Sequence, residues 1–175
     1  MGVALALTGC GPAATGPKVA KVSSGEMPTG AEWTGVYFEP LFGYLHVVQE
    51  GTTLSGKWQR PQKDRWGELH GDVNGNVVKF TWTEYEVGRV GPNAQKSGKG
   101  YFQYRRPEGE NMDDRIDGEL GRGQDELGTK FEGIRQRNVN PDLASIGNTA
   151  ADIQGGDWDS GSGESGSAES PAKPR

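Results

Sequence analysis

The chain has 175 residues, with 19 Lys and Arg against 24 Asp and Glu and a formal net charge of −5. This balance excludes a protein that binds nucleic acid through a basic stripe, and no run approaches the roughly 18 apolar residues of a transmembrane helix. Gly accounts for 29 residues without a collagen-like period, which favours β structure rich in turns.

The first ten residues, MGVALALTGC, join a short apolar run to the only cysteine of the chain. Leu7 stands three positions before Cys10, with a small Thr and a Gly between them. This spacing resembles the lipobox of bacterial lipoprotein signal peptides. The resemblance implies that the Cys10 thiolate takes a diacylglyceryl group, that the chain is cut before Cys10, and that acyl chains such as palmitate hold the protein at a membrane. Gly11 follows instead of Asp, which by resemblance to Gram-negative lipoproteins implies the outer membrane, with the protein facing the periplasm or the cell surface.

The same segment departs from a complete signal peptide. Its apolar run covers about five residues and carries no Lys or Arg, whereas signal peptides have a basic stretch and about seven to fifteen apolar residues. We therefore expect a basic stretch upstream of residue 1. The alternative is a chance apolar start that ends in a free Cys10.

Segments poor in apolar residues flank the central part of the chain. Residues 11–31, which follow the signal segment 1–10, are small, polar and rich in Pro and Gly, which predicts a flexible tether. Residues 155–175 are acidic and dominated by Gly and Ser, which predicts a disordered tail.

Eight short runs with β-type composition lie between these segments, separated by turn residues. The tightest turns are at Gly51 and at Asn74-Gly75-Asn76, which is a strong hairpin signal. Short consecutive strands at this spacing predict an all-β fold: an eight-stranded antiparallel meander that closes into a barrel over residues 32–137. The predicted strands are Trp33–Glu39, Phe42–Glu50, Thr52–Trp58, Trp66–Asn74, Asn76–Glu86, Gly98–Arg106, Arg115–Gly121 and Leu127–Gln136.

A Gly between two larger, mostly apolar residues recurs in these strands with period two, as in Leu54-x-Gly56-x-Trp58. The alternation places Gly and the large rings on one face and charged residues on the other. We expect the rings to fill a water-exposed barrel, with each Gly leaving room for a ring from the next strand. The alternatives are a membrane barrel with the rings against lipid, and an open β-sandwich. The expected core rings are Trp58, Phe80, Trp82, Phe102, Tyr104 and Phe131.

A short C-terminal helix is predicted after the last strand, within residues 138–154. Asn140 is the expected N-cap, Pro141 the first helical residue and Gly147 the end, with Leu143 and Ile146 against the barrel.

Eight meandering strands with an aromatic start and a trailing helix resemble the calycins, the group of lipocalins and avidins. The resemblance spans roughly residues 32–147 and is architectural. The lipocalin Gly-x-Trp of the first strand is replaced by Trp33-x-Gly35, so no binding residue follows from it.

Alternate loops of a meander lie at the same end of the barrel, and the loops after the first, third, fifth and seventh strands include the long ones. We expect them to face a partner or ligand, or alternatively to be merely solvated. Acidic residues such as Glu50, Glu108 and Glu110 gather in the opposite loops, where both ends of the barrel chain emerge. The tether should therefore leave from that end, with the long loops pointing away from the membrane. The basic residues expected to face a partner or ligand are Arg60, Lys63, Arg65, Arg89, Lys96 and Arg122.

Candidate catalytic and metal-ligating residues are few. Glu68, His70 and Asp72 share one strand face, but no second His or Cys stands at ligand spacing. The acidic residues of 108–114 fit no EF-hand loop, and the chain has neither a G-x-S-x-G motif nor a triad. We therefore expect no enzymatic activity, no cofactor and no metal.

Two functions remain open. The first is a non-catalytic, membrane-anchored envelope lipoprotein that docks a protein partner as an accessory or scaffold subunit. The second is a calycin-like binding protein for a small apolar or glycan ligand. A cavity above about 300 Å³ that opens at the long loops favours the second function. A filled interior with an exposed apolar patch favours the first.

Overall fold

In the computed structural model, residues 16–109 and 112–147 are described. The predicted anchor Cys10, residues 148–154 of the predicted linker and the tail 155–175 lie outside the described residues. None of the helical segments in the described part of the chain is long and apolar enough to cross a membrane.

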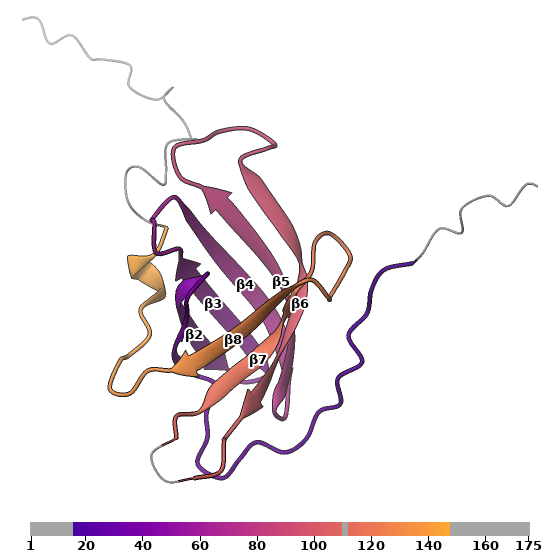
Figure 1. The fold of residues 1–175 in the computed structure, drawn as a ribbon, viewed down its shortest axis with the longest axis vertical. Coiled ribbons are helices and arrows are strands. Elements are labelled where there is room, and N and C mark those ends of the chain that lie inside the picture. The colour runs from indigo at the N-terminus through magenta and orange to yellow at the C-terminus, as the bar shows by residue number, and fades with distance from the viewer. Residues whose placement is uncertain (1–15, 110–111, 148–175) are drawn as a thin grey trace, which may run out of the picture.

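Eight antiparallel strands form a closed barrel in chain order (Figure 1). All eight predicted strands are confirmed, with ends that differ by at most three residues. The first and last strands pair through Tyr37 opposite Arg135 and Phe38 opposite Ile134, so the open β-sandwich alternative is wrong. The strands are β1 (Gly35–Glu39), β2 (Gly43–Glu50), β3 (Thr53–Gln59), β4 (Arg65–Asn74), β5 (Val77–Glu86), β6 (Gln95–Arg105), β7 (Arg115–Leu120) and β8 (Thr129–Arg135).

The Gly and aromatic face lies inside the barrel, as expected for a barrel with water outside. Its rings pack into one buried cluster. The Phe131 ring is central to this cluster, because its centroid lies 4.8 Å from that of Phe102 and 5.3 Å from that of Phe42. The interior glycines provide the space. A Cβ built on Gly100 would lie 2.7 Å from the Phe80 ring, and one on Gly133 would lie 2.5 Å from the Phe131 ring.

The predicted C-terminal helix is wrong. The structure has a single 3-10 turn, η1 (Leu143–Ser145), and its N-cap is Asp142 instead of Asn140. The Asp142 carboxylate accepts the N–H groups of Ala144 and Ser145. The chain is extended again at Ile146, whose side chain is buried. The segment has only two apolar residues to place against the barrel, Leu143 and Ile146. A turn followed by an extended residue is enough to bury Ile146, so no helix is needed.

The described part of the predicted tether, residues 16–31, lies along the barrel instead of forming a free coil. We call residues 16–31 the strap. In Figure 1 it is the indigo segment that descends from beside the β7–β8 loop to the opposite end of the barrel. Its composition predicts flexibility, but its backbone groups are satisfied by side chains of distant loops, a set of contacts that has no local sequence pattern.

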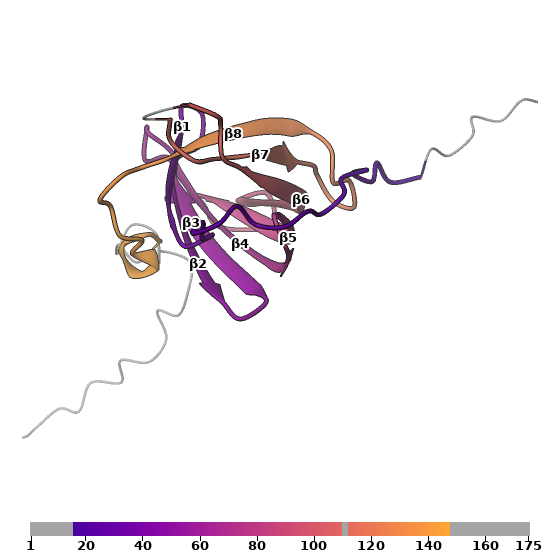
Figure 2. The same cartoon turned by 90° about the horizontal axis from the view of Figure 1, so that it is seen from below.

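The two ends of the barrel are defined by their loops. The loops after β1, β3, β5 and β7 form the long-loop end, and those after β2, β4 and β6 form the short-loop end. The view along the barrel in Figure 2 shows the strap on the outer wall, on the side of β6 and β7.

Candidate functional site

The six basic residues predicted to face a partner do not form one surface. Arg60, Arg65 and Arg89 are engaged in ion pairs within the barrel end or its loops. Lys63, Lys96 and Arg122 make no ion pair with any described residue. Lys63 and Arg122 are exposed, whereas Lys96 is half-buried opposite Glu84 on the neighbouring strand. Of the six, Lys63 and Arg122 are the two that are both exposed and without an ion-pair partner among the described residues.

Glu84, which the sequence analysis missed, closes the long-loop mouth of the barrel. It points inward from β5, on the same face as Phe80 and Trp82, and is only 5% exposed. Arg60 donates two hydrogen bonds to its carboxylate, Nε to Oε1 at 2.7 Å and Nη2 to Oε2 at 3.2 Å. The same guanidinium lies 5.1 Å from the centroid of the Phe42 ring. Period-two alternation along β5 is the signal that identifies this inward carboxylate.

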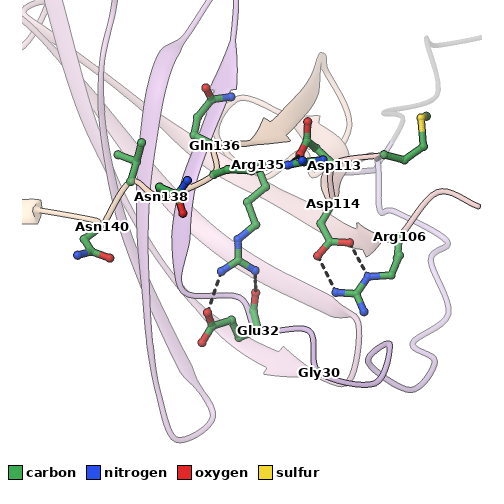
Figure 3. Close-up of a pocket in the computed structure, with 12 residues that line it drawn as sticks. Gly30, Glu32, Arg106, Asp113, Asp114, Arg135, Gln136, Asn138 and Asn140 are labelled. Carbon is green, nitrogen blue, oxygen red and sulfur yellow. Dashed lines mark hydrogen bonds and ion pairs between the residues drawn. The ribbon is translucent and has the colours of Figure 1, made fainter. Parts of the chain in front are cut away.

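A cluster of charged residues closes the short-loop end (Figure 3). Arg106 donates two hydrogen bonds to Asp114, Nε to Oδ1 at 2.7 Å and Nη2 to Oδ2 at 2.8 Å. The Tyr104 hydroxyl donates to the same carboxylate at 2.6 Å. Arg135 binds the Glu32 carboxylate at 2.8 Å and donates to the Thr34 carbonyl at 2.8 Å.

The pKa values of Asp114 and Tyr104 are both shifted in this cluster. The hydrogen bonds from Arg106 hold the pKa of Asp114 below its usual value, although burial opposes this shift. Burial, followed by the hydrogen bond to Asp114, raises the pKa of Tyr104 to about 12. At neutral pH, both shifts favour a neutral Tyr104 phenol that donates its hydrogen bond to an ionised Asp114 carboxylate.

An open pocket of about 550 Å³ lies over this cluster. Its lining contains three arginines and three carboxylates in mutual contact, so it offers no surplus charge for an ionic ligand. Arg106 also donates to the Thr29 carbonyl of the strap at 2.8 Å. The contacts of the cluster therefore join β8, the β6–β7 loop and the strap. The prediction of an acidic short-loop end omitted the arginines that neutralise it; Glu110 lies outside the described residues.

An exposed apolar row crosses the outer wall of β8, β1 and β2. Ile134, Phe38 and Tyr44 are direct cross-strand neighbours in the register. Ile134 is 48% and Tyr44 52% exposed, and the Phe38 and Tyr44 ring centroids lie 5.0 Å apart. We call Ile134, Phe38 and Tyr44 the wall patch. Outward-facing apolar side chains that touch one another are typical of a docking surface.

A groove of about 340 Å³ adjoins the wall patch. Its walls are Phe38 and Tyr44 on one side and Ser145 and Ile146 of the C-terminal segment on the other, with Lys63 at the rim. The segment is held in place by a hydrogen bond from the Asp142 N–H to Nδ1 of His46 at 2.9 Å. The groove is lined by outward residues of β1 and β2, so it lies outside the barrel interior.

Glu68 and His70 form hydrogen bonds with neighbouring side chains on the barrel wall. Glu68 accepts a hydrogen bond from the Tyr85 hydroxyl at 3.0 Å, and His70 contacts the Ser55 hydroxyl at 3.1 Å. Within residues 16–109 and 112–147, no cluster of three or more His, Cys, Asp or Glu has the arrangement of a metal site.

The class that these features define is the closed eight-stranded antiparallel meander barrel, an architecture consistent with the calycins. Comparisons with protein-family models, characterised proteins and solved structures find no match to this chain.

Proposed function

We propose that this protein is a lipid-anchored lipoprotein of the bacterial outer membrane that acts without catalysis, as an accessory or scaffold subunit that docks another envelope protein. The anchor is Cys10, as the lipobox spacing of residues 7–10 implies. The observation that carries the docking function is the wall patch on a barrel whose interior is filled with rings. A closed barrel has no sheet edge to offer, so side chains on its wall are the available means of contact.

The wall patch and its groove fit a partner of definite chemistry. An aliphatic or aromatic side chain of the partner enters the groove between Tyr44 and Ile146. A carboxylate beside that side chain meets Lys63, which has no ion-pair partner among the described residues. Burial of apolar side chains at about 25 cal/mol per Å² supplies the affinity, and the charge pair supplies orientation.

The alternative of a ligand inside the barrel has less support. Large side chains already occupy the interior, and the groove of about 340 Å³ lies on the outer wall. The Gly100 and Gly133 positions, where a cavity would be most easily opened, are occupied by the Phe80 and Phe131 rings.

Site-specific photo-crosslinking in intact envelopes tests the docking function. A photo-reactive phenylalanine analogue replaces Tyr44 in the wall patch, and in a control it replaces Thr81, an exposed outward residue of β5. We expect one defined product at position 44 and none at position 81. Ile134→Lys should abolish the product, whereas Thr81→Lys should leave it unchanged.

The same preparation also tests the anchor and the ligand alternative. Cys10→Ala should release the protein from the membrane fraction. Equal crosslinking at positions 44 and 81 would contradict docking through the wall patch. Recovery of bound lipid or saccharide with the purified barrel, without a protein partner, would favour the ligand-binding function.

A further inference from the structure

The strap determines where the N-terminal part of the chain leaves the barrel. Glu126 of the β7–β8 loop donates its N–H to the Lys18 carbonyl at 2.8 Å, and Lys18 donates its own N–H to Asp125 at 2.9 Å. The Ala20 N–H donates to the Glu126 carboxylate at 2.8 Å, and the Ala20 side chain is buried. These three hydrogen bonds fix the strap to the β7–β8 loop at the long-loop end.

A second contact fixes the strap at the opposite end. Gly25 and Asn76, in the β4–β5 turn, exchange two hydrogen bonds: the Gly25 N–H donates to Asn76 Oδ1 at 2.6 Å, and the Asn76 N–H donates to the Gly25 carbonyl at 3.0 Å. Met27 and Ala31 then pack against the core cluster. The strap therefore runs the length of the wall and returns the chain to the long-loop end, although β1 itself begins at the short-loop end.

The Glu126 carboxylate is well suited to this role. Its burial opposes ionisation, but the hydrogen bonds from Lys79 and from the Ala20 N–H outweigh this effect and hold the pKa of Glu126 below its usual value. The Lys79 Nζ lies 2.9 Å from the carboxylate. The Glu126 carboxylate therefore remains an ionised acceptor for the strap at neutral pH.

The reach from the strap to the lipidated residue is short. The eight residues from Gly11 to Lys18 follow Cys10. They span at most about 28 Å when fully extended, and about 16 Å as a flexible coil. An acyl group on Cys10 is therefore attached within about 28 Å of Lys18, whose hydrogen bonds lie at the long-loop end.

The long-loop end carries side chains that suit a lipid surface. Val90 at the tip of the β5–β6 loop is 66% exposed, and Leu41 in the β1–β2 loop is also exposed. Nearby carboxylates have partners: Glu86 pairs with Arg89, and Glu39 accepts the N–H groups of Leu41 and Phe42. Lys63 and Arg122 have no ion-pair partner in the described chain, whereas the Asp125 carboxylate at the same end, which also pairs with no described cation, accepts the Lys18 N–H.

We propose that the barrel stands with its long-loop end against the membrane, with Val90 and Leu41 at the lipid interface and Lys63 and Arg122 facing anionic headgroups. This orientation rests on the proposed anchor at Cys10 and is the reverse of the one that the sequence predicted. Apolar tips that enter the interface and cations that meet the headgroups act together with acyl chains in peripheral attachment.

Fluorescence quenching on the acylated protein tests the orientation. Because acylation occupies Cys10, a Cys introduced by Val90→Cys is the only thiol available for an environment-sensitive fluorophore. The matched control is Glu50→Cys, an exposed residue that ends β2 at the short-loop end. Both proteins are placed in vesicles of phosphatidylethanolamine and phosphatidylglycerol that contain a shallow spin-labelled lipid.

We expect several-fold stronger quenching at position 90 than at position 50. The double variant Asp125→Ala, Glu126→Ala removes both acceptor side chains of the strap contact and should reduce this difference while the protein stays acylated and membrane-bound. Stronger quenching at position 50 in an acylated protein would overturn the orientation and leave the proposed function intact. A mass spectrum without acyl chains would overturn the anchor, and the orientation with it.

Discussion

Substitution of Gly133 by Ala tests the central feature of the fold. In this feature, an aromatic ring fills the space that a side chain would need at an inward-facing glycine. A Cβ at this position would lie 2.5 Å from Phe131 Cε1 and 3.1 Å from both Ile116 Cγ1 and Tyr37 Cβ. Carbon atoms in good contact lie about 3.5–4.0 Å apart, so the Phe131 ring must move by about 1 Å. That ring is packed against Phe102 and Phe42, so it cannot move without disturbing its neighbours.

Overpacking of this kind costs about 1–3 kcal/mol, whereas the smaller entropy of the unfolded Ala chain returns about 0.4–1 kcal/mol. We therefore expect a net loss of about 0.5–2 kcal/mol, and a fall in the thermal midpoint of about 2–8 °C for a domain of this size. Circular dichroism on heating and urea titration measure both quantities. Gly16→Ala is the control, because a Cβ there meets nothing within 4 Å.

The double variant Gly133→Ala, Phe131→Leu separates the clash from a general effect of the substitution. Leu lacks the ring edge that meets the new methyl group, so the loss in the double variant should be smaller than the sum of the two single losses by about 1 kcal/mol. Additive losses, or a Gly133→Ala protein as stable as the parent, would refute the explanation that rings occupy the glycine positions.

Three further predictions concern charged and polar groups. Glu84→Ala should lower the free energy of unfolding by about 2–4 kcal/mol in urea titration, because it leaves the half-buried Arg60 guanidinium without its carboxylate and removes one of the three carboxylates near Arg65. The more exposed Glu86→Ala should cost under about 1 kcal/mol, and similar losses for the two variants would contradict the interpretation of the barrel mouth. Burial raises the pKa of Tyr104 from 10.0 to about 12. The neutral phenol therefore contributes stability that is complete below pH 10 and is lost as the pH rises through about 12. Tyr104→Phe should lack this loss when unfolding is measured as a function of alkaline pH. Burial lowers the pKa of His46 below 6.5, so the bond from the Asp142 N–H should be kept above pH 6.5 and lost as the pH falls through the lower folded value. The protection factors of the backbone amides that follow, which correct exchange rates for their intrinsic pH dependence, should fall in that range. Protection factors that do not change with pH would contradict the role of His46.

The strands and their inward faces could be predicted because the information is local. Turn residues at Gly51 and Gly75 set the hairpins, and both glycines have positive φ, 61° and 55°. Alternation of side chains then decides which residues share the interior. The same rule also places Glu84 inside, although a carboxylate is not expected in an apolar face unless it is paired.

The strap and the paired arginines could not be predicted in this way. The strap is held by hydrogen bonds over more than a hundred positions in sequence, such as Lys18 to Asp125, and polar Gly- and Pro-rich residues carry no pattern that marks such contacts. A count of the charged residues in each loop does not show which opposite charge each of them contacts. Arg60 reaches a strand residue inside the barrel, and the arginines that neutralise Asp114 and Asp113 come from the residues just after β6 and just after β8.

The route of the strap also decides which neighbours the wall patch can meet. With the long-loop end on the membrane, the outer wall of β8, β1 and β2 stands at the side of the barrel and not at its top. The wall patch then faces proteins that rise from the same membrane, and the groove beside Tyr44 opens close to the lipid surface, because Lys63 at its rim belongs to the β3–β4 loop. In the proposed orientation, a partner anchored in the same membrane would meet the patch at high effective concentration, and a wall patch of modest area would suffice for docking.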